Sequence, residues 1–299
     1  MVGALVKIIT VATSHNRKDK TLVALQSLHA QRLPLNVDVE HVLVDDGSSD
    51  GTSDAVMRNF PKVKMLSGTG ELFWAGGMRH AWQSYLRYQQ FSALVVYNDD
   101  VTLRTDALSS MLEVHDEMIA NTSEPFTVAG RFIDPTTRRI SFGGRNKALL
   151  GSPGRLVPAV PNGKYGRVDT INMNLTLIPK RTIEAVGFLS DKYSHALADF
   201  DYGLRVLKQG GANVLLREPV GFCTSNPTVG SSRDKGLGGL RRLMRSLSIK
   251  EYPPRERLHF LLTHAGALGL FVYPIPYVRA LIGGIGPPSP NETRLRRKR

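Results

Sequence analysis

Two neighbouring carboxylates at the end of an apolar run are the residues of this chain best suited to chemistry. The run at 94–97 is rich in β-branched residues and predicts a buried strand, and Asn98, Asp99 and Asp100 follow it directly. Paired carboxylates at a strand end repel each other and lose hydration, so a cation should compensate them. A hard divalent ion such as Mg²⁺ or Mn²⁺, itself holding substrate phosphates, is the simplest candidate. The alternative for this motif alone is an ordinary turn.

Acidic residues also follow another predicted strand and open a predicted helix. Asp45 and Asp46 follow a strand at 39–44, where a carboxylate could accept the imide N–H of uracil or thymine. Asp46 is the better placed, although a turn and helix cap explains both residues without any ligand. Asp199 and Asp201 are either favourable charges at a helix N-terminus or a general base. A sugar hydroxyl attacking an anomeric carbon needs such a base, whereas a leaving diphosphate needs a metal and cations.

Further residues could line the same site. Gly76, Gly77 and Arg79 could let backbone and guanidinium approach a phosphate at a helix start. Trp74 could wall a sugar, although core packing is the default for an aromatic side chain. The eight histidines show no metal-ligand spacing, and His195 is retained as a candidate ligand. The sequence lacks the glycine motifs of P-loop nucleotidases, Rossmann dehydrogenases and α/β-hydrolases, which argues against those classes.

Hydrophobic periodicity predicts the elements that position these residues. Strand and helix alternate four times in about the first 120 residues, which predicts a mainly parallel sheet with helices on both faces. The predicted strands lie at 7–12, 39–44, 63–66 and 94–97, and the predicted helices lie around 22–28, 52–60 and 75–88. In such sheets ligands bind at the carboxyl ends of the strands. Here those ends carry Thr13 and two pairs of aspartates, so the polar signals fall on one edge.

The middle of the chain is less regular. The sequence predicts, in order, a strand at 128–133, a hairpin at 140–150, a Gly/Pro-rich loop at 151–167, a strand at 168–178, helices at 179–186 and from about 199 to 210, and a last strand at 213–216. Asn172 and Asn174 alternate with apolar residues in the strand at 168–178. The long loop is of a kind that is usually functional or mobile.

The composition changes beyond residue 225. We expect a catalytic domain at 1–228 and a C-terminal helical extension at 229–299. The formal net charge of +13 implies an anionic partner such as nucleotide phosphates, acidic lipid or nucleic acid. Residues 258–278 contain no acid, Lys or Arg and reach the minimum length of a membrane span, but histidines and prolines interrupt them. We expect a helix that lies on or dips into a membrane surface, and packing on the main domain is the alternative.

The single cysteine bears on the compartment. Cys223 excludes an internal disulfide and a cysteine-rich zinc site, so a reducing compartment is expected. The first residues lack the charged start and long apolar centre of a signal peptide and predict a first strand instead. We therefore expect a cytoplasmic protein that is peripheral at the inner face of the cell membrane.

Together these stretches resemble the family 2 glycosyltransferases, inverting enzymes with the GT-A fold, and especially the bacterial rhamnosyltransferase-like members that build surface polysaccharides. The resemblance covers about residues 7–216. It rests on Thr-Ser-His-Asn-Arg at 13–17, Val-Asp-Asp-Gly-Ser-Ser-Asp-Gly-Thr at 44–52, Phe-Trp-Ala-Gly-Gly-Met-Arg at 73–79, Asn-Asp-Asp-Val at 98–101 and Asp-Phe-Asp-Tyr-Gly-Leu-Arg at 199–205. Each stretch is common alone, whereas five in this order are specific.

The resemblance implies roles on the donor side of the reaction. Thr13 would line the nucleotide pocket, and Asn16 and Arg17 in the same stretch would also bind the nucleotide sugar. Asp46 would bind the base, and Asp99 would reach the ribose.

The resemblance also implies a metal ligand and a catalytic base. Asp100 would ligate Mg²⁺ or Mn²⁺, and Asp199 matches the catalytic base, which usually follows a glutamate that Ala198 replaces here. Family members often carry a late histidine near the metal, whereas 221–224 contain none, so His195 stands as the candidate third ligand.

Three residues are candidates for the acceptor side. They are Asn172, Asn174 and Asp201, and Asp201 could also substitute for the missing supporting acid.

The sequence thus predicts a metal-dependent inverting glycosyltransferase that moves a sugar, with rhamnose as a candidate, from a dTDP or UDP donor to a glycan or lipid-linked acceptor. One rival is a nucleotidyltransferase that makes a nucleotide sugar. It would normally carry a Gly-rich, basic loop after the first strand, and the stretch at 13–17 is not that loop. The second rival is a binding protein for acidic lipid or nucleic acid, which would not require acids at three strand or helix ends.

Overall fold

Two units make up the chain, Met1–Ser225 and Asn226–Arg299, and the predicted boundary after residue 228 lies close to the division between them. The computed structural model describes residues 5–148 and 154–283. The first unit contains a large sheet with its helices, and the second contains short helices.

The first half of Met1–Ser225 has the strand–helix alternation that the sequence predicts. Strands β3, β2, β1 and β4 lie side by side in that order, and the pairings between them are parallel. The bounds are β1 Val6–Ser14, α1 Lys18–His29, β2 Val37–Asp45, α2 Thr52–Asn59, β3 Lys64–Ser67, α3 Phe73–Ser84, η1 Leu86–Tyr88 and β4 Ala93–Tyr97. Every residue of β4 is buried, as expected for an apolar run that forms a central strand.

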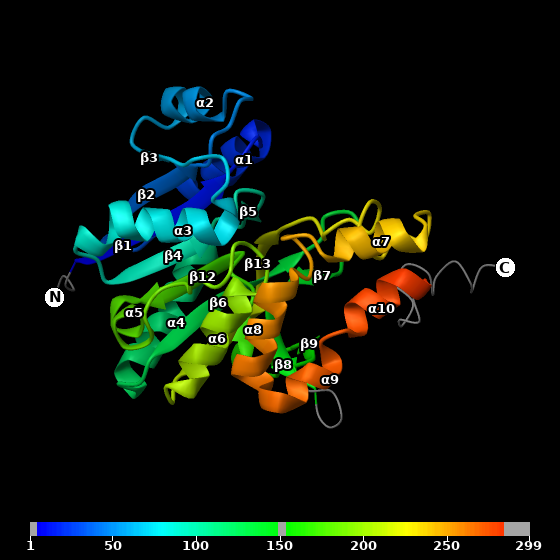
Figure 1. The fold of residues 1–299 in the computed structure, drawn as a ribbon. Helices are drawn as coiled ribbons and strands as arrows, with labels where there is room; N and C mark the ends of the chain where they lie inside the picture. Colours follow the sequence, from blue (N-terminus) through cyan, green and yellow to red (C-terminus); the bar gives the residue numbers. More distant parts are fainter. Residues whose placement is uncertain (1–4, 149–153, 284–299) are drawn as a thin grey trace. The chain divides into compact units, whose positions relative to one another are not determined.

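Helices cover both faces of this sheet (Figure 1). On one face, α1 and α4 (Ala107–Asn121) bury Leu25 and Met111 in an apolar core that includes Val95 of β4. On the other face, α3 packs on β1, and α6 (Ala198–Lys208) packs on the strands of the second half.

The second half corrects the expectation of a mainly parallel sheet, because the sheet is mixed. β12 (Leu175–Pro179) lies between β4 and β6 (Phe126–Ile133) and is antiparallel to both. β13 (Ala212–Phe222), longer than the strand predicted at 213–216, is parallel to β6. A parallel neighbour needs a long crossover, usually a helix. The described residues between β6 and β12 form strands and loops without a helix, so β12 enters the sheet in the opposite direction.

A strand and a hairpin predicted in the middle of the chain are divided differently in the structure. The strand expected at 168–178 is broken into the end of β10, then β11 and β12, with a gap at 172–174. The hairpin expected at 140–150 is β7 and β8, but β7 pairs with β6 while β8 joins β9 and β11 in a second sheet. The remaining bounds are β5 Thr102–Leu103, β7 Ile140–Phe142, β8 Gly144–Lys147, β9 Leu156–Pro158, β10 Tyr165–Val168, β11 Thr170–Ile171 and α5 Lys180–Val186. Residues 149–153 of the predicted hairpin and loop lie outside the described residues.

The second unit contains α7 Gly239–Ser246, α8 Pro254–Ala265, η2 Gly266–Leu268, α9 Gly269–Val272 and α10 Ile275–Ile282. The helix predicted over 258–278 is therefore divided, with a break before α10 at Pro274. No single helix in the described ranges has the length and apolar character to cross a membrane. Within the part of the chain that the structure describes, Pro254–Val272 and Ile275–Ile282 meet that test only together, as a pair bent by 41°.

The packing of α3 on β1 generates a stability prediction. A Cβ atom at Gly77 would lie 2.4 Å from Thr13 Oγ1 and Cγ2, which is closer than non-bonded atoms approach. We expect Gly77→Ala to lower the free energy of unfolding by about 1–3 kcal/mol, because overpacking forces the helix and strand apart. Gly76→Ala on the same helix is the matched control, since its Cβ would meet Leu72 Cβ at an ordinary 3.4 Å. Urea denaturation of both variants checks this, and equal stability of the two would contradict it.

Candidate functional site

Three strand ends of the parallel half meet at one edge of the sheet. Ser14, the last residue of β1, pairs with Asp45, the last residue of β2. Asp46 N donates to Ser14 O at 2.8 Å, which ties the two strand ends together. β4 runs parallel to β1 and ends at Tyr97, so Asp99 leaves the sheet at the same edge. The structure thus gathers the strand-end acids at the edge where the sequence predicts them.

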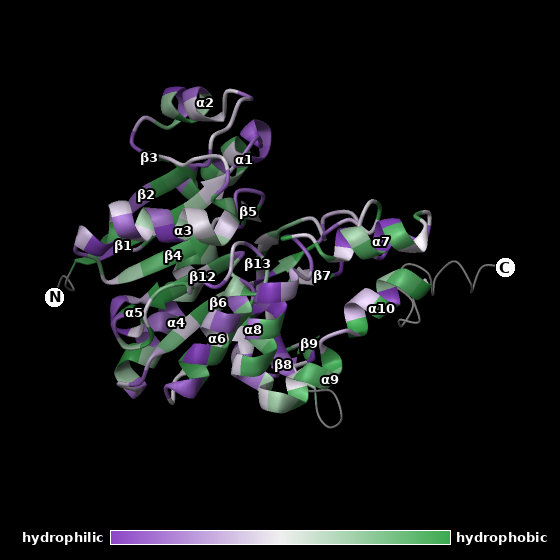
Figure 2. Cartoon of the chain, viewed as in Figure 1, coloured by the Kyte–Doolittle hydropathy of each residue, from purple (hydrophilic) through white to green (hydrophobic). Residues whose placement is uncertain are grey.

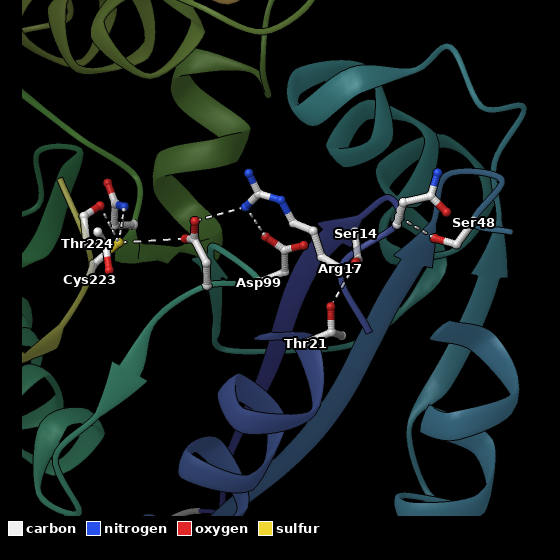
Figure 3. A network of polar contacts seen from close by, with 10 residues as sticks. Ser14, Arg17, Thr21, Ser48, Asp99, Cys223 and Thr224 are labelled. Atoms are coloured by element: carbon white, nitrogen blue, oxygen red, sulfur yellow. Dashed lines mark hydrogen bonds and ion pairs between the residues drawn. The ribbon is translucent and has the colours of Figure 1, made fainter. Parts of the chain in front are cut away.

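Arg17 bridges the two carboxylates after β4. Its Nη1 atom lies 3.1 Å from Asp99 Oδ1 and 2.9 Å from Asp100 Oδ2. Figure 3 shows the Arg17 guanidinium pointing toward Asp99. The Asp99 side chain is only 7% exposed and that of Asp100 is 24% exposed. The positive charge that the acid pair requires is supplied, within the protein, by an arginine from the loop after β1.

The environment of Asp99 suits a cation. Burial raises its pKa, the charge of Arg17 lowers it, and the neighbouring charge of Asp100 raises it again. The Ser14 hydroxyl, which is also bonded to Thr21, lowers the pKa of Asp99 as well. Among the described residues, Asp99 Oδ2 is buried and has no hydrogen-bond partner. A hard divalent cation is commonly held by one or two carboxylates together with substrate phosphates. Asp99 and Asp100 therefore fit the Mg²⁺ or Mn²⁺ that the sequence predicts.

The predicted third metal ligand is not found at this pair. Among residues 5–148 and 154–283, no group of three or more His, Cys, Asp or Glu side chains could hold a metal ion. His195 lies half-buried in the loop before α6 and forms no such group with Asp100. Cys223, from the stretch 221–224 in which a third ligand was expected, approaches Asp100 with Sγ 3.6 Å from Asp100 Oδ1. Burial and the charge of Asp100 raise the pKa of this thiol, which favours its protonated form.

The break between β11 and β12 links the acid pair to the start of α6. Asn98 N donates to Asn174 O at 3.2 Å, and Asn174 Nδ2 donates to Cys223 Sγ at 3.6 Å. Two residues earlier, Asn172 Nδ2 donates to Asp199 Oδ2 at 3.1 Å. One short segment therefore contacts Asp199 directly and reaches the acid pair through Asn98 and Cys223, which lie next to that pair.

Asp199 is half-buried at the first turn of α6 and is held by neutral donors. Phe200 N donates to Asp199 Oδ1 at 2.8 Å, in addition to the bond from Asn172. Leu197, just before the helix, adopts a left-handed φ of 69°, which is rare for a branched residue and turns the chain into α6. Burial raises the pKa of Asp199, and the bonds from Asn172 and Phe200 and the charge of Arg145 oppose that shift. A carboxylate with raised proton affinity is suited to general-base chemistry.

Asp201 faces a different environment although it is on the same turn. Its side chain is buried, Arg205 Nε lies 2.8 Å from Asp201 Oδ2, and the Tyr193 hydroxyl donates to Oδ1 at 3.4 Å. Arg205 also donates to the carbonyls of Val186 and Phe188. These contacts hold α6 to the preceding loop, while a role of Asp201 toward an acceptor stays a prediction.

Asp46 uses both carboxylate oxygens to hold the loop between β3 and α3. Gly70 N donates to Asp46 Oδ1 at 2.8 Å, and Phe73 N donates to Oδ2 at 3.0 Å. Phe73 has a left-handed φ of 56°, an uncommon conformation for an aromatic residue that this bond helps to fix. Contact of Asp46 with a nucleotide base stays a prediction, whereas its binding of the loop is a structural finding.

The other donor-side candidates lie around the same loops. Asn16 Oδ1 accepts a bond of 2.7 Å from Ser49 N, and its own N–H donates to Ser48 Oγ (Figure 3). Thr13 Oγ1 and Trp74 Nε1 are buried polar atoms without a partner in the described part of the chain. Contact of either residue with a nucleotide sugar stays a prediction.

Arg79 contacts the protein rather than an open surface. It donates to the carbonyls of Ser190 and Tyr193 at 2.8 and 2.7 Å, which fastens α3 to the loop before α6. Ala75 N donates to Ser194 O at 3.0 Å and strengthens the same connection. Binding of a phosphate by Arg79 stays a prediction.

Sequence reasoning missed two residues of this site. Cys223 was considered only for disulfides and zinc, but it touches Asp100. Arg145 on β8 places its charge near Asp199 and stacks on Phe200, with 5.4 Å from its guanidinium carbon to the ring centroid. No motif marks either residue, because Cys223 reaches the site from the end of β13 in the large sheet and Arg145 from β8 in the second sheet, both through tertiary contacts.

Comparison with known proteins identifies the kind of fold. Residues 10–144 match the family model described as glycosyl transferase family 2. No curated protein matches the chain. One similar solved structure is the mannosyltransferase PcManGT from Pyrobaculum calidifontis in complex with GDP-Man and Mn²⁺, with TM-score 0.50 and 16% identity over 98% of this chain and 79% of the other. Another is TarS 1–349 from S. aureus, with TM-score 0.52 and 14% identity over 92% of this chain and 73% of the other. At these identities the likeness establishes the α/β fold, which is GT-A-like.

Proposed function

We propose that the protein is an inverting glycosyltransferase that uses a nucleotide diphosphate sugar as donor. The observation that carries the proposal is the segment 172–174, which bonds Asp199 directly and bonds Asn98 and Cys223, the neighbours of the carboxylate pair after β4. The match of residues 10–144 to glycosyl transferase family 2 supports the same activity. It covers the three strand ends, and the acid at the start of α6 completes the site from outside the match.

The donor would lie against the edge formed by β1, β2 and β4. Asp99 and Asp100 would hold a divalent cation, with Asp99 also reaching the ribose, while Thr13 would line the nucleotide pocket and Trp74 would wall the sugar. When bound, Mg²⁺ or Mn²⁺ would neutralise charge on the leaving diphosphate. The donor nucleotide we propose is UDP or dTDP, with rhamnose as a candidate sugar, and the GDP-Man of the structural neighbour makes GDP sugars a third class to test.

Asp199 would act on the acceptor. Its Oδ2 atom would take the proton of the attacking hydroxyl as the new glycosidic bond forms and the bond to the diphosphate breaks, in one in-line displacement. Oδ1 is engaged by the N–H of Phe200 and fixes the carboxylate on its own helix. A single displacement inverts the configuration at the anomeric carbon. We propose a hydroxyl of a glycan or lipid-linked acceptor in surface polysaccharide synthesis.

The rivals are less compatible with the site. A nucleotidyltransferase needs no base at the position of Asp199. A protein that only binds acidic lipid or nucleic acid needs neither the buried acid pair nor its connection through 172–174 to a second acid.

The extension would dock the protein on an anionic membrane at the cytoplasmic face. The exposed side of α7 pairs an apolar ridge, Leu240 and Met244, with a basic ridge, Arg241 and Arg245, around a hollow of ≈ 440 Å³. Figure 2 shows apolar residues on α7, α9 and α10 as well. A helix that presents apolar and basic ridges side by side suits the interface of an anionic bilayer. A lipid-linked acceptor would lie in the same membrane.

The first prediction from this proposed function concerns the base. We expect Asp199→Asn to lower sugar transfer by about a hundredfold or more while binding of the donor nucleotide persists, because the amide cannot take a proton. Release of UDP, dTDP or GDP from the corresponding sugar donors, with Mn²⁺ or with a chelator, measures the reaction. Asp191→Asn in the preceding exposed loop is the control and should retain activity. Full activity of the Asp199 variant would remove this residue as the base.

The second prediction concerns pH. Asn172 donates to the ionised carboxylate of Asp199 and thereby lowers its pKa, so Asn172→Ala should raise that pKa. Since the base acts when deprotonated, the acidic limb of the kcat/KM profile should move to higher pH. Asn121→Ala is the control, since this asparagine is exposed at the end of α4 and its side-chain amide donates to Glu117 O. Superimposable pH profiles for wild type and Asn172→Ala would contradict this expectation.

The third prediction concerns the membrane. Replacing Arg241 and Arg245 with Gln should weaken co-sedimentation with phosphatidylglycerol vesicles, since each basic residue near such a surface contributes about 1 kcal/mol. The paired control, Arg32→Gln with Arg58→Gln, removes the same charge from exposed positions in the first unit. Equal losses in the two double variants would show that net charge rather than this face of α7 governs binding.

A further inference from the structure

Arg17 stands at the position that a cation would take between the two carboxylates. A single nitrogen, Nη1, contacts Asp99 Oδ1 and Asp100 Oδ2 at 3.1 and 2.9 Å (Figure 3). A divalent ion that joined the pair would bridge the same two carboxylates. One positive group therefore has to give way before the other can occupy the site fully, because two cations that close repel each other.

The remaining carboxylate oxygens leave a cation little alternative. Asp99 Oδ2 is buried and has no hydrogen-bond partner in the described residues. Asp100 Oδ1 faces the thiol of Cys223 at 3.6 Å. Arg17 covers one oxygen of each carboxylate, so a cation that binds both acids competes with it for Asp99 Oδ1 and Asp100 Oδ2.

The exposure of the three side chains indicates which group can move. The Arg17 side chain is 43% exposed, against 7% for Asp99 and 24% for Asp100. Arg17 lies just before α1, and its contacts to the acids are made by the end of a long side chain. Rotation of that side chain can open the pair, while the acids stay fixed by their strand end.

We propose that Arg17 closes the cation site in the free protein and releases it when a nucleotide diphosphate arrives. A guanidinium pairs as well with phosphate oxygens as with carboxylates, so the diphosphate offers Arg17 a replacement partner. Cation and nucleotide would then bind as a coupled pair, and the cation alone would bind weakly. This inference rests on the proposed function, since it requires a diphosphate ligand at the same edge.

Binding of Mn²⁺ without any turnover tests the inference. Free Mn²⁺ is measured by electron paramagnetic resonance in titrations of the wild-type protein and of Arg17→Gln, each alone and with UDP, dTDP or GDP. We expect Arg17→Gln alone to bind Mn²⁺ about fivefold more tightly than wild type alone, the scale of losing a competing, partly exposed ion pair. The gain in Mn²⁺ affinity on adding nucleotide should be correspondingly smaller in the variant, because binding free energies are coupled reciprocally.

Two further variants separate competition from other effects. Arg104→Gln removes an equal charge from an exposed pair with Asp106 and should leave Mn²⁺ affinity unchanged. Arg17→Lys keeps the charge on a different head group and should bind Mn²⁺ more weakly than Arg17→Gln. Thermal unfolding of each variant confirms that the fold is retained.

The outcomes distinguish this inference from the proposed function. If wild type binds Mn²⁺ with a nucleotide but Arg17→Gln alone binds it no more tightly than wild type alone, the role of Arg17 is overturned and the donor site stands. An equal gain in Arg104→Gln also overturns it, because the effect would then be one of net charge. If no form binds Mn²⁺ with or without these nucleotides, the acid pair is not a cation site and both proposals fail.

Discussion

Two carboxylates held close together at the end of a buried strand require positive charge, and the rest of the site is arranged around that requirement. β4 is buried along its whole length, so the backbone that follows it has little conformational freedom. Asp99 and Asp100 therefore lie side by side. Burial and mutual repulsion raise the cost of keeping both ionised. Arg17 relieves that cost from one side, and the Cys223 thiol faces Asp100 from another. The loop after β1 and the end of β13 thus meet at the same pair of side chains.

The mixed sheet is what brings a second acid to this pair. Had β12 continued a parallel series, a helical crossover would separate it from the acid edge. It instead pairs antiparallel with β4, so the residues before it emerge beside the end of β4. The segment 172–174 lies at that point, bonded to Asn98 on one side and to Asp199 on the other. The departure from a parallel fold therefore has a direct consequence for the chemistry of the site.

The parts of the site that follow from local pattern could be predicted from the sequence. Parallel strands place their carboxyl ends at one edge, so Ser14, Asp45 and Asp99 had to lie near each other once the strands were recognised. A contact between side chains that are far apart in the sequence has no comparable sequence pattern. Arg17 and the acids it binds lie 82 and 83 positions apart, and their contact depends on where a flexible side chain ends.

The direction of β12 and the hydrogen-bond partners of Asp46 also could not be predicted from the sequence pattern. Periodicity identifies a strand at 168–178 but not its break or its orientation, which depend on the partners it finds. Asp46 was recognised as the important acid of its turn. Both of its carboxylate oxygens accept hydrogen bonds from the main chain, at Gly70 and Phe73. These bonds depend on how an irregular loop folds, which the local sequence does not show. Local sequence therefore located the acids, while tertiary contacts decided what each one binds.

The contrast between Asp199 and Asp201 explains why one of two adjacent acids suits the role of base. Asp201 has the guanidinium of Arg205 at 2.8 Å, which stabilises its charge and ties it to the structure of the helix. Asp199 accepts bonds from neutral groups such as Asn172 and the N–H of Phe200 and has the charge of Arg145 nearby, yet burial still raises its pKa. A group that is to accept a proton must not be too well satisfied as an anion. The environment therefore separates two residues of the same type, two positions apart, into a structural anion and a candidate base.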